Sequence, residues 1–181
     1  FYMPIWALIL ALIYIFTLLF VFTFSLVQLH LVYHYLFTKK NSSKVAYKIS
    51  DNLPIVTVQL PIYNEMYVVE RLLDAVSNIE YPIELLEIQV LDDSTDETSS
   101  ILATKIAELQ KNGFDIVHIK RQNRTGYKAG ALAFGTATAK GEFIAIFDAD
   151  FLPKSSFLLE ALPSFDDNKI GMVQSRWLHI N

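Results

Sequence analysis

The chain has 181 residues, of which 52% are hydrophobic and 19% are charged, with a formal net charge of -4 and no cysteine. The lack of cysteine excludes a catalytic thiol and agrees with a reducing compartment. Because the net charge is negative, and because basic residues gather only locally, no nucleic-acid partner is expected. The length allows one ordinary domain and a membrane segment.

The first 38 residues are the most apolar part of the chain. Phe1 to Thr38 contain no Asp, Glu, Lys or Arg and exceed the ~20 apolar residues that a membrane span requires. A signal peptide has an apolar core of only ~7–15 residues and a small-residue cleavage site, which this segment does not match. We therefore expect residues 1–38 to form a transmembrane helix in a lipid bilayer.

Residues 39–52 have the composition of a basic and polar linker. Four lysines directly follow the apolar segment, at Lys39, Lys40, Lys44 and Lys48. The positive-inside rule then places the remainder in the cytoplasm. The expected location is an integral membrane protein with a cytoplasmic catalytic domain, in the plasma membrane or, if bacterial, the inner membrane.

Strand and helix patterns alternate from residue 53 to residue 181. The strand patterns are residues 55–60, 86–91, 115–120 and 142–148, and the helix patterns are residues 65–78, 96–111 and 128–139. This alternation predicts an α/β domain with a mainly parallel sheet. Within it, the apolar run from Phe143 to Asp150 predicts the central strand, buried on both faces.

Two carboxylates end that run, at Asp148 and Asp150. In an extended chain, side chains two residues apart point the same way, so both could face one ligand. Paired oxygens at the carboxyl edge of a sheet suit a divalent cation that carries a phosphate. Alternatively, one aspartate begins a turn before Pro153 and caps the following helix.

The first two strand patterns also end in polar residues. Tyr63 can stack on a planar base, and Asn64 can bond a nucleoside or cap the next helix. Asp92 and Asp93 lie where open α/β sheets bind ligands. Ser94, followed at the third position by Glu, predicts a capping box for the next helix.

The third strand pattern leads into a basic run, with Lys120, Arg121, Arg124 and Lys128 among nine residues. A solvated loop is one interpretation. However, the run precedes a helix start, whose free amides favour an anion, and Gly126 and Gly130 permit close backbone approach. Phosphate is the expected ligand, although neither a P-loop nor a dinucleotide fingerprint is present.

Four motifs in this order resemble the membrane-bound family 2 glycosyltransferases, in particular the cellulose-synthase-like group that makes β-linked mannans and glucans. The motifs are Pro61-Ile62-Tyr63-Asn64-Glu65, Val90-Leu91-Asp92-Asp93-Ser94-Thr95-Asp96, Arg124-Thr125-Gly126-Tyr127-Lys128-Ala129-Gly130-Ala131-Leu132 and Asp148-Ala149-Asp150. The resemblance covers about Leu53 to Asn181. It implies a Rossmann-like GT-A fold, a UDP-sugar or GDP-sugar donor and a divalent cation, Mn or Mg.

The same resemblance implies roles for individual residues. The base and ribose would be held by Pro61, Tyr63, Asn64, Glu65, Asp92 and Asp93. Lys128, aided by Arg124, would face the diphosphate. Asp148 and Asp150 would bind the metal, with Asp148 also serving the nucleotide.

The chain departs from the family pattern near its last residues. Gln174-Ser175-Arg176-Trp177 has one spacer residue where the family's Gln-x-x-Arg-Trp motif has two. We expect a fifth strand there, whose residues Gln174, Arg176 and Trp177 contact sugar or acceptor. The family's general base follows in a later acidic motif, so no catalytic base is expected here and the chain should not transfer sugar alone.

The expected function is therefore an inverting hexosyltransferase that extends a β-linked polysaccharide or another glycan or lipid-linked acceptor. Two alternatives remain open on the residues. One is a membrane-tethered nucleotide-binding module without transferase activity. The other is a metal-dependent nucleotidyltransferase, which would use the same carboxylates and basic loop.

Overall fold

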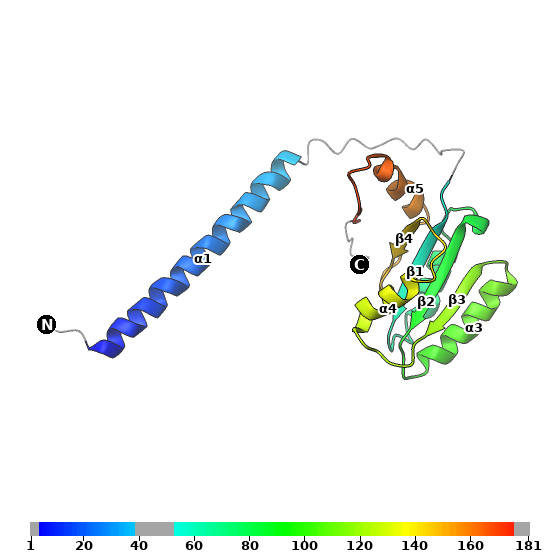
Figure 1. Cartoon of the computed structure of the whole chain (residues 1–181), viewed down its shortest axis with the longest axis horizontal. Helices are drawn as coiled ribbons and strands as arrows, with labels where there is room; N and C mark the ends of the chain where they lie inside the picture. The colour runs from blue at the N-terminus through cyan, green and yellow to red at the C-terminus, as the bar shows by residue number, and fades with distance from the viewer. Residues whose placement is uncertain (1–3, 39–52, 176–181) are drawn as a thin grey trace. The chain divides into compact units, whose positions relative to one another are not determined.

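The structure, a computed structural model, describes residues 4–38 and 53–175 (Figure 1). The chain divides into two units, Phe1–Ala46 and Tyr47–Asn181. In the first unit, helix α1 covers Ile5–Thr38. This helix is long and apolar enough to cross a membrane, and its large apolar side chains are exposed. The predicted helix is confirmed, whereas its insertion in a bilayer stays a prediction; the predicted linker, 39–52, lies outside the described residues.

The second unit is an α/β domain (Figure 1). In its described residues, four parallel strands form one sheet in the order β3-β2-β1-β4. The strands are β1 (Val56–Ile62), β2 (Leu86–Asp92), β3 (Asp115–Lys120) and β4 (Phe143–Ile146). The helices are α2 (Val69–Ser77), α3 (Thr98–Lys111), α4 (Tyr127–Thr136) and α5 (Phe157–Ala161), with short 3₁₀ turns η2 (Ile83–Leu85) and η3 (Leu162–Asp166). The predicted parallel α/β architecture is confirmed.

One face of the sheet forms the hydrophobic core with α2 and α3. Alternate residues of β1, such as Val58 and Leu60, are fully buried in one cluster with Leu72 of α2 and Leu102 of α3. This period of two is the natural spacing of side chains on one face of a strand. Burial of such side chains is worth about 1.5–3 kcal/mol each, so this layer holds the strand ends in place.

The opposite face, under α4, is buried but polar. Thr57 donates to Glu87 at 2.5 Å, and Gln59 donates to Gln89 at 3.0 Å, each across paired positions of β1 and β2. Helix α4 approaches closely because Gly135 has no side chain: a Cβ there would lie 2.7–2.8 Å from Leu91 and both glutamines. The sheet therefore holds α4 close to it, together with the basic run that leads into this helix.

The prediction of a buried central strand at 143–150 is wrong in two respects. In the described sheet β4 is an edge strand, and its Ile144 and Ile146 are 38% and 48% exposed. The strand also ends at Ile146, and Asp148 begins a turn in which Phe151 donates to its carbonyl at 2.9 Å. Apolar composition alone does not distinguish an edge strand from a central one, because both need one covered face.

The helix ends differ less from expectation. Helix α2 begins at Val69 rather than at residue 65, because Val68 has a φ of -121°, outside the helical range. The fifth strand predicted from Gln174 is not present in its described part, since Gln174 and Ser175 have no strand structure. Residues 176–181 lie outside the described residues.

Candidate functional site

A cavity of about 360 Å³ opens at the carboxyl edge of the sheet. The register aligns this edge, because Ile62 pairs with Asp92 and Asp92 pairs with Lys120. The cavity is lined by Pro61, Ile62, Tyr63, Glu65, Leu91, Asp93, Arg124, Lys128, Ala131, Asp148, Ala149 and Asp150. Seven residues predicted to bind nucleotide and both predicted metal ligands are among them, brought together from three strand ends and the start of α4.

Asp92 does not line this cavity. Its carboxylate is buried and accepts hydrogen bonds from the Ser94 amide, the Ser99 hydroxyl and Nε2 of His118. Burial alone would raise the pKa of Asp92, but the bonds from His118, Ser99 and Ser94 outweigh it and hold that pKa well below its usual range. Asp92 thus ties β2 to β3 and α3, behind the cavity wall.

The predicted capping box at Ser94 is wrong. The Ser94 hydroxyl accepts from the Asn64 amide at 3.0 Å, and the amide of Thr98, at the start of α3, donates instead to Asp96 at 3.0 Å. Asn64 is not a helix cap either, because its side-chain oxygen accepts from the Thr95 amide at 2.9 Å. Asn64 adopts a left-handed φ of 55°, which asparagine tolerates better than most residues. These bonds join the loops after β1 and β2.

Arg121 begins the basic turn, which we define as residues 121–128, and makes most of the side-chain bonds that hold it. Its Nε donates to Asp93 at 2.9 Å, Nη2 also bonds the same carboxylate, and the ion pair is nearly buried. Nη1 donates to the carbonyl of Thr125 at 2.9 Å, and Nη2 to that of Tyr127 at 3.1 Å. The sequence marked Arg121 only as one of four cations, since nothing local reveals a partner 28 residues away.

Arg124 covers one face of the Tyr63 ring, with its guanidinium carbon 3.3 Å from the ring centroid. It lies 5.1 Å from the Tyr127 centroid and 4.0 Å from the Asp93 carboxylate. Such a stack is a favourable cation–π contact. A base could therefore stack on Tyr63 only on the other face or after Arg124 has moved.

Lys128 and Asp148 form an ion pair at the mouth of the cavity. The carboxylate of Asp150, which lines the same cavity, has no ion-pair or hydrogen-bond partner within the described ranges. No cluster of three His, Cys, Asp or Glu side chains forms in those ranges. Two carboxylates fit a divalent cation that takes its other oxygens from water and a diphosphate, as Mg²⁺ commonly does. In the ligand-free structure the ammonium of Lys128 supplies the positive charge beside Asp148.

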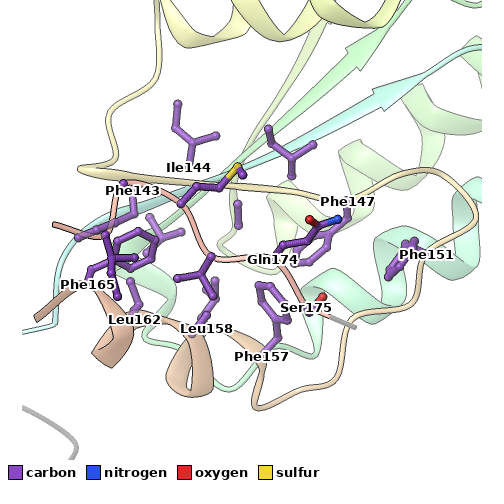
Figure 2. Close-up of a pocket in the computed structure, with 18 of the residues that line it drawn as sticks. Phe143, Ile144, Phe147, Phe151, Phe157, Leu158, Leu162, Phe165, Gln174 and Ser175 are labelled. Atoms are coloured by element: carbon purple, nitrogen blue, oxygen red, sulfur yellow. The ribbon is translucent and has the colours of Figure 1, made fainter. Parts of the chain in front are cut away.

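A second, larger cavity of about 760 Å³ shares Lys128 and Asp148 with the first. Phenylalanines from β4, α5 and the adjoining turns line it: Phe143, Phe147, Phe151, Phe157 and Phe165 (Figure 2). Gln174 and Ser175 also line it and add polar groups beside these aromatic side chains. Of the three residues predicted to contact the acceptor, Gln174 is thus near the site, whereas Arg176 and Trp177 lie outside the described residues.

Most of the α/β domain is similar in sequence to known proteins. Residues 57–181 match the protein family described as Glycosyl transferase family 2. The chain is 42% identical over 133 residues to a probable glucomannan 4-beta-mannosyltransferase of Oryza sativa subsp. japonica, which is 71% of this chain and 24% of that protein. It is 37% identical over 152 residues to a glucomannan 4-beta-mannosyltransferase of Cyamopsis tetragonoloba, which is 80% of this chain and 29% of that protein.

A solved structure shares the fold. A mannosyltransferase from Pyrobaculum calidifontis, in complex with GDP-Man and Mn²⁺, superposes with a TM-score of 0.64 at 30% identity. The match covers 78% of this chain and 41% of that one. The matches to the two plant proteins span only about a quarter of the length of those proteins.

Proposed function

The chain belongs to glycosyl transferase family 2, and on that basis we propose that its α/β domain binds a sugar nucleotide, with GDP-mannose as the preferred donor, for transfer to a β-linked glycan. The observation that carries the proposal is the single cavity that collects Asp93, Arg124, Lys128, Asp148 and Asp150 at the carboxyl edge of the sheet. The choice of mannose is supported by the names of the plant relatives and by the GDP-Man complex.

The charges in the cavity suit a nucleoside diphosphate. Arg124 and Lys128 lie at the start of α4, where free amides and the helix dipole favour an anion. In the proposal, Lys128 exchanges its bond to Asp148 for a phosphate oxygen, which frees Asp148 to face a divalent cation together with Asp150. A bound Mn²⁺ or Mg²⁺ would there neutralise charge on the leaving diphosphate.

The nucleoside end of the donor would lie between the first two strand ends. Pro61, Tyr63 and Glu65 line one side of the cavity and Asp93 the other. In our proposal Tyr63 and Glu65 contact the base and Asp93 the ribose. Asn64 and Asp92 support this wall through their bonds to Thr95 and His118, and act on the nucleoside indirectly.

The proposed reaction is an inverting transfer. The acceptor hydroxyl oxygen forms a bond to the anomeric carbon, the bond from that carbon to the diphosphate breaks, and the diphosphate leaves with the electron pair. The acceptor proton must pass to a base, a contribution of typically ~10²–10⁴ in rate. We place the acceptor on the side of the larger cavity, near Gln174, because the two cavities meet at Lys128 and Asp148.

The family assignment does not favour the two alternatives, a tethered nucleotide-binding module and a nucleotidyltransferase. We further propose that α1 anchors the domain in a bilayer, on the strength of its length and apolar composition.

Titration calorimetry of the chain in detergent tests the donor assignment. GDP should bind in Mn²⁺ buffer more tightly than UDP, and excess EDTA should weaken binding. If neither GDP nor UDP bound, the proposal would be refuted. A preference for UDP would refute only the choice of donor.

A further inference from the structure

Arg121 connects two parts of the cavity wall that are distant in the sequence. One side of its guanidinium pairs with Asp93 after β2, and the other side donates to the carbonyls of Thr125 and Tyr127 in the basic turn. The Asp93 amide in turn donates to the carbonyl of Ile62 at 3.0 Å. A continuous set of bonds therefore runs from β1 through Asp93 and Arg121 to the start of α4.

The turn that Arg121 holds has an unusual backbone. Gly126 and Tyr127 both adopt left-handed conformations, with φ of 74° and 50°. A bulky residue such as tyrosine rarely has a positive φ and does so when surrounding contacts impose it. The bonds from Arg121 to the carbonyls of Thr125 and Tyr127 enclose this strained pair.

The packing against α4 shows that this arrangement is tight. A Cβ on Gly130 would lie 2.0 Å from the Thr125 carbonyl oxygen and 2.8 Å from Nη1 of Arg121. The arginine side chain is only 9% exposed, so it is covered by the turn rather than presented to a ligand. Its role must therefore be exerted through the residues that it bonds.

We propose that Arg121 is a positioning residue for the donor diphosphate: by bonding Asp93 and the turn together, it sets the directions of Arg124 and Lys128. The proposal rests on the proposed function for the identity of the ligand. Lysine cannot replace arginine here, because a single ammonium cannot bond a carboxylate in fork geometry and two carbonyls at once.

The test compares Arg121→Lys with Arg71→Lys, a matched change at an exposed arginine of α2. In Mn²⁺ buffer, calorimetry of the detergent-solubilised chain should show GDP affinity reduced about tenfold by Arg121→Lys and unchanged by Arg71→Lys. Because Arg121 acts partly through Lys128, its effect should add only in part to that of Lys128→Gln: the remaining loss in the double variant, relative to Lys128→Gln alone, should come from Arg124 and be smaller than the tenfold loss in the wild-type background. Fully additive losses, or no loss of affinity in Arg121→Lys, would overturn the proposal.

Amide hydrogen exchange of the ligand-free chain gives a second readout. Arg121→Lys should accelerate exchange at residues 125–130 and leave the buried α2 residues Leu72 and Leu73 unchanged. Equal acceleration in α2 would show a general folding defect and overturn the positioning role. If the wild type bound neither GDP nor UDP, the proposed function would be refuted. If the wild type and Arg121→Lys both bound GDP normally, the positioning role alone would be refuted.

Discussion

The ammonium group of Lys128 is bonded to the carboxylate of Asp148, and both residues line each of the two cavities. Both side chains are about half exposed, at 53% and 39%, so the pair can open without disturbing the core. An incoming diphosphate would compete with Asp148 for the lysine. In the ligand-free site Lys128 thus neutralises Asp148, and donor and divalent cation should bind interdependently.

Lys128→Gln should weaken GDP binding in Mn²⁺ buffer by roughly 10- to 100-fold. This is the expected loss for one hydrogen bond to a charged group, about 1.5–3 kcal/mol. Lys154→Gln, at an exposed lysine outside both cavities, is the control and should bind as the wild type does. Calorimetry is the measurement, and equal affinities of the two variants would exclude a diphosphate contact at Lys128.

Asp150→Asn should reduce GDP affinity in Mn²⁺ buffer and have little effect in excess EDTA, because a carboxylate beside a diphosphate is favourable only when a cation lies between them. Asp166→Asn, at an exposed position on η3, serves as the control. Titrations with and without EDTA measure the difference. If the wild type bound GDP equally well in both buffers, the carboxylates would have no metal role.

Asp92→Asn should destabilise the domain by about 1–3 kcal/mol at neutral pH, the typical result of disturbing a buried, hydrogen-bonded charge. Because the folded-state pKa of Asp92 is lowered, its stabilising contribution is complete above the ordinary aspartate pKa of about 3.9. That contribution is lost as pH falls from there through the folded-state pKa. Urea unfolding at several pH values should therefore show the wild type and variant converging below about pH 4. A difference that stayed constant with pH would contradict the assigned bonds.

Gly130→Ala should destabilise the domain by about 1–3 kcal/mol, as overpacking does, and should also weaken GDP binding. The added Cβ would collide with the Thr125 carbonyl, and relief of that collision would displace the basic turn. Gly171→Ala is the matched control, because a Cβ there meets nothing within 4 Å. Thermal melting and calorimetry together check the prediction, which fails if both variants melt and bind alike.

The sequence alone determined the alternation of strands and helices, because hydrophobic period and turn residues are local properties. The observed bounds of β3 are those predicted, residues 115–120. The sequence also indicated which edge of the sheet carries the site, since parallel strands bring their carboxyl ends together. The apolar segment at residues 1–38 likewise identified a long helix from composition alone.

Only the tertiary structure separated Asp92 from Asp93. Successive side chains at a strand end point to opposite sides, and the chain cannot reveal which side is closed until β3 and α3 are in place. In the folded domain His118 bonds the carboxylate of Asp92, and Arg121 bonds that of Asp93. The partners lie 26 and 28 residues away, too far for any local pattern to specify. For the same reason no local pattern could place β4 beside β1 at the edge of the described sheet, because strand order depends on packing across the whole sheet.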